Sequence, residues 1–178
     1  MSPQVQFFLA DLDKYGRRVP LDELTRAMEK LDISLDDIRE YVEFDPKRYR
    51  RNLMYNGRGF QALILCWRNG QRSPIHDHVG SSCGVKVLKG VMTETIFDRG
   101  PNGMIVASRS RDLEEGVVCG SQDDDIHQVS NLQSGDEDLL TLHIYSPPLL
   151  SMNMYSLLDS QVQRFDDPVH ELLHGAGI

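Results

Sequence analysis

Cysteine is scarce in this sequence, which has only three among its 178 residues. Cys66, Cys83 and Cys119 lie in apolar, strand-like runs and lack the close spacing of a disulfide framework. A chain of this length with 40% hydrophobic residues can bury enough apolar surface to fold without disulfides or a structural metal. We therefore expect a reduced, cytosolic protein in which any bound metal serves chemistry.

Positive charge is also in short supply, since 19 Lys and Arg residues face 27 Asp and Glu residues, for a formal net charge of −8. No run of Lys or Arg forms a basic stripe, which argues against a nucleic acid or an anionic membrane as partner. No apolar stretch approaches the ~18 residues that cross a bilayer, and the sequence does not open with a signal peptide. We expect a cytoplasmic monomer whose partners are small molecules.

Periodicity divides the chain into a helical front and a strand-rich remainder. Helical spacing of apolar residues predicts three amphipathic helices: the first begins at Ser2-Pro3 and stops before Gly16, the second runs from Leu21 to Leu31, and the third opens with a Ser34/Asp37 capping box and carries Ile38, Tyr41 and Val42. From Phe60 onward, short β-rich runs alternate with turn residues, which is typical of a sandwich or small barrel.

We therefore predict a mainly β jelly roll, a small cupin-type barrel with the N-terminal helices packed outside. The chain is expected to form a single domain, residues 1–178, with a helical segment at 1–45, the barrel at 46–165 and a tail at 166–178.

Two histidines lie one residue apart in the segment "SPIHDH" at 73–78. On a strand, His76 and His78 would point to the same face, so both imidazoles could reach one ion. An isolated pair of this kind is more often structural. Its neighbours change that interpretation, because Gly70, His76, His78, Cys83 and Gly90 have the spacing of the first cupin motif, with Cys83 in the usual glutamate position.

The second cupin motif is matched in the same way by Gly116, His127 and Asn131, although Gln122 and Asp124 replace its usual proline and glycine. His76, His78 and His127 then become the predicted metal ligands. Without the carboxylate of the common iron site, three neutral imidazoles leave the full charge of a divalent ion, which favours a thiolate donor. Cys83 itself could be a fourth ligand in a closed zinc site, or a small buried hydrophobe.

Five longer motifs show that the sequence resembles the cysteine dioxygenase family from about Tyr41 to Pro148. They are "YRRN" at 49–52, "LILCW" at 63–67, "SPIHDH" at 73–78, "KVLKGVMTET" at 86–95 and "LHIYSPP" at 142–148. The resemblance implies an iron(II) enzyme that adds both atoms of O2 to the sulfur of L-cysteine, giving cysteine sulfinic acid. It also implies His76, His78 and His127 as iron ligands, Arg51 as the partner of the substrate carboxylate, Tyr49 near the substrate, and Tyr145 in the active site.

Cys83 takes a further role from the resemblance, because family members with cysteine at this place link its sulfur covalently to the active-site tyrosine, here Tyr145. The residues themselves support a polar chain beside that tyrosine. Thr141, His143 and Tyr145 alternate along one expected strand, so their side chains face the same side and can form hydrogen bonds in sequence. The family usually has serine at the position of Thr141, and both residues offer a hydroxyl.

Other functions stay open at the level of sequence. A related enzyme could oxidise 3-mercaptopropionate, although Arg51 argues against it because relatives that prefer that thiol typically carry glutamine there. The chain could also be a cupin that binds metal without turnover. Finally, His170-Glu171-Leu172-Leu173-His174 spells the zinc-peptidase pattern, but Pro168 and Gly175 leave little room for the supporting helix, so we interpret it as part of a frayed tail.

Overall fold

A computed structural model describes residues 1–166 of the chain, and the zinc-peptidase pattern at 170–174 lies outside them. Among the described residues, no helix is long and apolar enough to cross a membrane. The elements, in chain order, are α1 (Pro3–Asp13), α2 (Leu21–Lys30), α3 (Leu35–Ile38), the 3-10 helix η1 (Arg39–Tyr41), β1 (Arg50–Asn56), β2 (Gln61–Trp67), β3 (Ile75–His76), β4 (Ser82–Lys89), β5 (Met92–Arg99), β6 (Ile105–Leu113), β7 (Val118–Gln122), β8 (Ile126–Ser130), β9 (Leu139–Ser146), β10 (Ser151–Tyr155) and β11 (Val162–Asp166).

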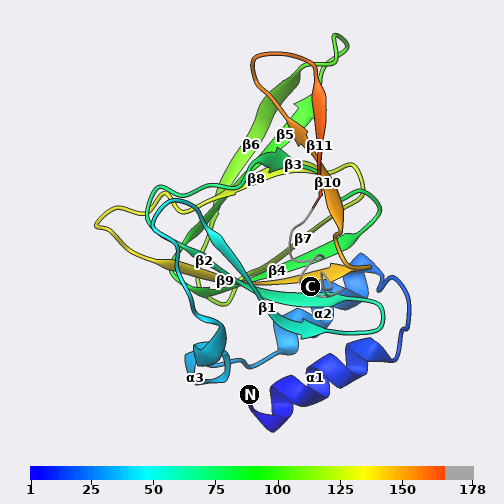
Figure 1. Ribbon diagram of the computed structural model, residues 1–178, viewed down its shortest axis with the longest axis vertical. Coiled ribbons are helices and arrows are strands. Elements are labelled where there is room, and N and C mark those ends of the chain that lie inside the picture. Colours follow the sequence, from blue (N-terminus) through cyan, green and yellow to red (C-terminus); the bar gives the residue numbers. More distant parts are fainter. Residues whose placement is uncertain (167–178) are drawn as a thin grey trace, which may run out of the picture.

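The strands form two facing sheets, which Figure 1 shows one above the other. The five-stranded sheet has the order β1-β2-β9-β4-β7, and the six-stranded sheet has the order β11-β10-β3-β8-β5-β6. Every pairing within them is antiparallel. The predicted mainly β jelly roll is confirmed, as a sandwich of two sheets.

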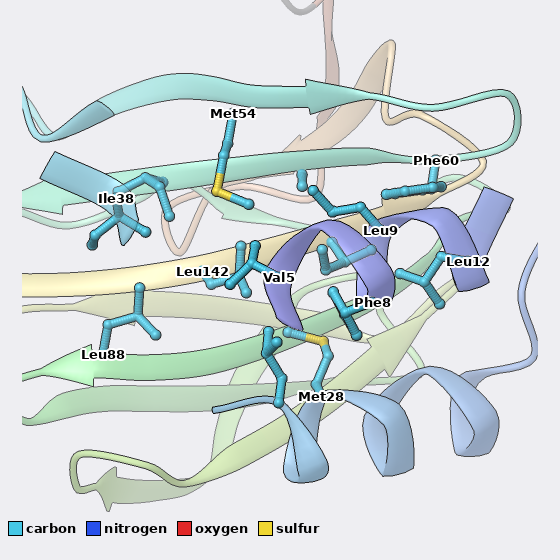
Figure 2. Close-up of a cluster of buried hydrophobic side chains, with 14 of the residues drawn as sticks. Val5, Phe8, Leu9, Leu12, Met28, Ile38, Met54, Phe60, Leu88 and Leu142 are labelled. Atoms are coloured by element: carbon cyan, nitrogen blue, oxygen red, sulfur yellow. The ribbon is translucent and has the colours of Figure 1, made fainter. Parts of the chain in front are cut away.

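The helices cover the outer face of the five-stranded sheet, as predicted (Figures 1 and 2). Val5, Phe8, Leu9 and Leu12 of α1 are buried in one core cluster with Ile64, Leu142 and Ile144 of the sheet, among others. Helix α2 lies so close to the sheet that a Cβ on Gly120 would sit 2.8 Å from side-chain atoms of Leu21 and Thr25. Glycine is therefore required at that strand position by the packing of the helix.

Strand β9 is central to the five-stranded sheet, where it pairs with β2 on one side and β4 on the other. All eight of its residues are buried, because helices cover one face and the opposite sheet covers the other. Leu140, Leu142 and Ile144 face the helices, whereas Leu139 and Tyr145 belong to the cluster between the sheets. The alternation of side chains thus places one set of β9 residues inside the sandwich.

Some elements differ from their predicted form. The third helix is short, ending at Ile38, and the chain continues as η1, so Tyr41 and Val42 are not in an α-helix. Its predicted capping box between Ser34 and Asp37 is present. Strands β1 and β11 were not predicted, because β1 is rich in Arg and Asn with a single buried residue and β11 is exposed throughout, so neither has the apolar alternation of a half-buried strand.

Candidate metal centre

Three histidines converge between the two sheets. His76 and His127 are paired residues on the neighbouring strands β3 and β8, and His78 follows β3. Their ligand atoms all lie within 4.8 Å of one another, and all three side chains are buried. This spacing brings three imidazoles within reach of one ion.

His78 reaches the centre in a different way from the one predicted. Strand β3 ends at His76, so strand alternation does not orient His78, and that part of the prediction is wrong. Instead, its backbone N–H donates to the carbonyl of Asp123 at 3.0 Å, and its own carbonyl accepts from the N–H of Ser81 at 3.0 Å. Two backbone hydrogen bonds thus orient this histidine from a turn.

Asp77, between the two histidines, fixes the other side of the same segment. Its buried carboxylate accepts hydrogen bonds from the side-chain amide of Asn153 at 2.9 Å and from the hydroxyl of Tyr155 at 2.6 Å. Burial, and then this bond to Asp77, raises the pKa of Tyr155 to about 12, so its hydroxyl remains a donor at neutral pH. Asp77 therefore anchors the histidine segment to β10.

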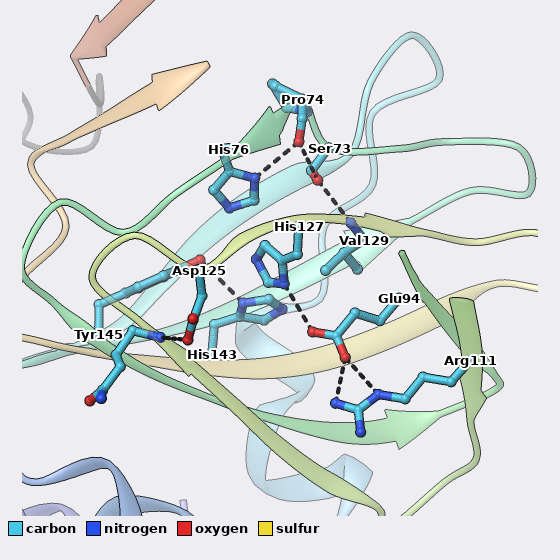
Figure 3. Close-up of polar contacts among 11 residues, drawn as sticks. Ser73, Pro74, His76, Glu94, Arg111, Asp125, His127, Val129, His143 and Tyr145 are labelled. Carbon is cyan, nitrogen blue, oxygen red and sulfur yellow. Dashed lines mark hydrogen bonds and ion pairs between the residues drawn. The ribbon is translucent and has the colours of Figure 1, made fainter. Parts of the chain in front are cut away.

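Hydrogen bonds at Nδ1 orient the two strand histidines (Figure 3). His76 Nδ1 lies 3.0 Å from the carbonyl oxygen of Pro74, which can only accept, so the proton lies on Nδ1 and the lone pair of Nε2 is left for a metal. His127 Nδ1 lies 2.9 Å from Glu94 Oε1 in the same arrangement. The other oxygen of Glu94 accepts two bonds from the guanidinium of Arg111, at 2.8 and 2.6 Å.

Glu94 and Arg111 were missed by sequence reasoning. Burial alone would raise the pKa of Glu94, but its hydrogen bond with His127 and its ion pair with Arg111 lower it below the ordinary value, so Glu94 is a carboxylate at neutral pH. The only sign of Glu94 in the sequence is a charged residue within the strand-like run "VMTETIF". That pattern does not reveal its partners, His127 and Arg111.

The buried ring of His78 indicates that an ion or ligand binds here. Its side chain is fully buried, yet neither ring nitrogen has a hydrogen-bond partner among the described residues. Burial and then repulsion by His127 lower the pKa of His76 to about 3, and the same two causes lower the pKa of His78 well below its usual range. The imidazoles of His76 and His78 are therefore neutral, which is the form that binds a metal.

A chain of polar groups runs along β9 on the facing sheet. His143 Nδ1 lies 3.2 Å from the Tyr145 hydroxyl, and His143 Nε2 lies 3.0 Å from Thr141 Oγ1. The indole N–H of Trp67, which sequence reasoning did not include, donates to the same Thr141 oxygen at 3.0 Å. Burial lowers the pKa of His143 well below its ordinary value, so this imidazole is neutral too.

Cys83 and Tyr145 are directly opposite one another on β4 and β9, and both belong to the core cluster between the sheets. Burial raises the pKa of the Cys83 thiol well above its usual range. The guanidinium of Arg51 lies 5.3 Å from the centre of the Tyr145 ring, and the Tyr145 and His78 ring centres are 6.2 Å apart. These residues therefore lie together beside the histidines.

The Tyr49 ring stacks on Trp67 with centroids 4.2 Å apart, so it contacts the indole that donates to Thr141. The nine residues singled out from the sequence thus fall into two groups on opposite layers: His76, His78 and His127 on or next to the six-stranded sheet, and the other six on or next to the five-stranded sheet.

A cavity of about 670 Å³ opens on the other side of His127. It is lined by Glu94, Arg111 and Tyr155, together with acidic residues such as Asp98 and Asp124, and His127 is the only one of the three histidines that lines it. Arg51, Cys83 and Tyr145 do not line this cavity. It therefore adjoins His127 on the side away from these three residues.

Fold and site together define a class of protein: a cupin with a three-histidine metal site. One solved structure, an uncharacterized conserved protein with a double-stranded β-helix domain from Klebsiella pneumoniae, shares this fold with a TM-score of 0.52 and 18% identity, covering 70% of this chain and 96% of that chain. The family model for cysteine dioxygenase type I matches residues 4–157. The chain belongs to that family. Cysteine dioxygenase type 1 from Bos taurus and that from Homo sapiens are each 40% identical to it over 139 residues, which are 75% of this chain and 68% of the relative.

Proposed function

We propose that this chain is a non-haem iron(II) dioxygenase that oxidises L-cysteine with O2 to cysteine sulfinic acid. The observation that carries the proposal is the convergence of three buried histidines, two with lowered pKa values and with no carboxylate among the three, in a chain of the cysteine dioxygenase family. His76, His78 and His127 are the proposed ligands. When bound, iron(II) would bring O2 and the thiolate together and activate O2, while the four electrons that reduce O2 come from the thiolate sulfur.

The proposed substrate groups lie on the layer that faces these ligands. Arg51 offers a planar, permanently charged fork that suits the carboxylate of cysteine. Tyr145 lies between Arg51 and His78, close enough to both for its hydroxyl to contact the thiol end of the substrate. Tyr49 is proposed to lie near the substrate on the same layer, where its ring stacks on Trp67.

The directions of the hydrogen bonds along β9 assign a role to each of the bonded residues, which are Trp67, Thr141, His143 and Tyr145. Trp67 can only donate, so Thr141 accepts from it, and we propose that the Thr141 hydroxyl in turn donates to His143 Nε2. His143 then carries its proton on Nδ1 and donates it to the Tyr145 oxygen. In this scheme Thr141 and His143 are positioning residues that fix the orientation of the Tyr145 phenol.

Glu94 is a positioning residue for the proposed metal ligand His127. Its hydrogen bond to Nδ1 of His127 fixes the ring orientation and makes Nε2 a stronger donor, while Arg111 holds the carboxylate in place.

Oxygen uptake with L-cysteine tests the proposal. Protein stripped of metal and reloaded with iron(II) should consume one O2 for each cysteine sulfinic acid formed, and protein reloaded with zinc should consume none. His127→Ala should lose both tight iron binding and activity. The double variant His170→Ala/His174→Ala, which removes the zinc-peptidase pattern, is the matched control and should retain both. Equal oxidation with zinc and iron would refute the redox mechanism.

A further inference from the structure

The connection between α1 and α2 contacts β4 and the turn between β7 and β8, a turn that is hydrogen bonded to His78. Arg18, in this connection, makes four hydrogen bonds through its guanidinium. Two of them form a fork on the carboxylate of Asp123, at 2.7 and 2.9 Å. The others reach Ser82 Oγ at 2.9 Å and Gln122 Oε1 at 3.1 Å. One side chain thus joins the helical segment to β4 and to the turn between β7 and β8.

Asp123 connects that turn to two of the proposed ligands. Its carbonyl accepts the backbone N–H of His78 at 3.0 Å, and its own N–H donates to Ser81 at 3.2 Å. It also precedes His127 by only four residues. The conformation of Asp123 therefore affects His78 directly and His127 through the chain.

The turn is closed by two hydrogen bonds of its own, from the Asp125 N–H to the Gln122 carbonyl at 2.9 Å and from the Gln122 N–H to Asp125 Oδ2 at 2.8 Å, but its sequence and backbone work against it. Asp123 has a φ of +52°, in the left-handed region that residues other than glycine adopt only at some cost. It is followed by Asp124 and Asp125, so three adjacent carboxylates repel one another. Positions 122 and 124 carry glutamine and aspartate where the second cupin motif has proline and glycine, the two residues that would shape such a turn. Side-chain bonds therefore help to hold the turn, that of Asp125 from within it and those of Arg18 from the helical segment.

We infer that Arg18 is a positioning residue for the metal centre, because its fork on Asp123 fixes the backbone carbonyl that orients His78. This inference rests on the proposed function only in taking His78 as a ligand. The side chains of Arg18 and Asp123 are 35% and 46% exposed, so their ion pair adds little to overall stability. Loss of Arg18 should therefore show at the metal site more strongly than in the unfolding temperature.

Cobalt(II) provides a readout that does not depend on turnover. The stripped full-length protein is titrated with cobalt(II) alone, and the dissociation constant and the visible d–d spectrum are recorded. Arg18→Ala should weaken cobalt binding about tenfold and change the spectrum, which is the size of effect seen when a group that orients a ligand is removed. Arg18→Lys keeps one contact to Asp123 but loses the fork, so its affinity should fall between those of Arg18→Ala and the wild type.

Arg26→Ala is the matched control, because it removes an arginine that makes only an exposed ion pair with Asp22 on α2. Its cobalt affinity and spectrum should equal those of the wild type. Asp123→Asn keeps a residue that tolerates a positive φ while removing the charge, so it should resemble Arg18→Ala, and combining the two should add little more. If Arg18→Ala fails to fold, Arg18→Lys and Asp123→Asn carry the test.

Unchanged cobalt affinity and spectrum in the folded Arg18 and Asp123 variants would overturn the inference, as would a wild type that binds no cobalt. A lower melting temperature with unaltered cobalt binding would assign Arg18 a purely structural role and would also overturn it. A wild type that binds cobalt but, loaded with iron, does not oxidise cysteine would refute the proposed function alone.

Discussion

At the scale of single residues, the pairing of Cys83 with Tyr145 has a chemical consequence. Directly opposite residues of an antiparallel pair have their Cβ atoms about 5 Å apart, which places the thiol beside the phenol ring. We predict that aerobic turnover with iron joins them as a thioether, with one hydrogen lost from the thiol and one from the ring to O2 as oxidant. Intact mass should then show a species about 2 Da lighter.

Cys83→Ala should abolish the light species, whereas Cys66→Ala, which removes a buried cysteine on the other face of the sheet, should retain it. Mapping the link to Cys66 or Cys119 would contradict the assignment.

Arg51 is expected to determine which thiols are used. Arg51→Gln keeps a donor but loses the charge and the fork, so kcat/KM for cysteine should fall by about 2–5 kcal/mol in transition-state binding, which is roughly 30-fold or more. Cysteamine has the thiol and amine but no carboxylate, so it should be a poor substrate for the wild type and lose little more in the variant. Steady-state kinetics with both thiols checks this, and equal proportional losses would mean that Arg51 supports the fold or the metal centre instead.

Residue patterns in the sequence were informative where one strand carries the whole arrangement. Thr141, His143 and Tyr145 share a face of β9 as alternation requires. The route of His78 could not be predicted, because its orientation depends on backbone bonds to a turn 45 positions away in the chain. Nor could Glu94 and Trp67, because a single buried carboxylate or indole does not reveal its partner.

At the scale of elements, the start of α3 also anchors the beginning of α1. The Asp37 carboxylate accepts from the N–H and hydroxyl of Ser34, at 3.1 and 2.8 Å, and from the N–H of Ser2. The hydrogen bonds from Ser34 lower the pKa of Asp37 to about 2 in the folded protein, against an opposing effect of burial.

This shift predicts a pH-dependent contribution to stability. Since the pKa is lower in the folded state, the ionised Asp37 stabilises the fold above its unfolded pKa of about 4, and this contribution is lost as the pH falls toward 2. Asp37→Asn should therefore cost about 1–2 kcal/mol at pH 7 and progressively less below pH 4. Urea unfolding between pH 3 and pH 7 measures it.

Asp36→Asn is the matched control, because its carboxylate is exposed and pairs only with Arg39. It should change stability by less than about 0.5 kcal/mol at every pH. A penalty for Asp37→Asn that does not vary with pH would show that the shift in the Asp37 pKa does not contribute to stability.

Elements with an apolar face were predictable, and those without one were not. Helices α1 and α2 and the buried strands have apolar faces that their sequence periodicity shows. Strand β1 lies at the edge of its sheet and is polar, so it has no apolar face that would predict it. It nevertheless carries Arg51, a proposed substrate residue. The close fit of α2 on Gly120 is likewise a tertiary property that local sequence does not encode.

At the scale of the whole molecule, a bound metal should stabilise the native state. Unfolding separates ligands that come from β3, the following turn and β8, so only the folded chain offers the full set. Metal at 100 times its dissociation constant adds about 2.7 kcal/mol. For a chain of this size, that corresponds to a rise of roughly 5–10 °C in melting temperature.

Calorimetry of the loaded and chelator-stripped protein checks this prediction. His127→Ala should show a much smaller difference between the two. Identical melting temperatures for loaded and stripped wild type would mean that the histidines do not bind the ion in the native state.

The division of the proposed active site between two sheets gives the packing between them a role in catalysis. The ligands come from one layer and the substrate groups from the other, so the gap across which cysteine must fit is set by the apolar side chains that separate the layers. Leu63, Val85 and Val129 lie in the cluster between the layers and are therefore expected to set this spacing. A change of volume at any of them alters the distance between thiol and phenol without touching a single group that takes part in the chemistry.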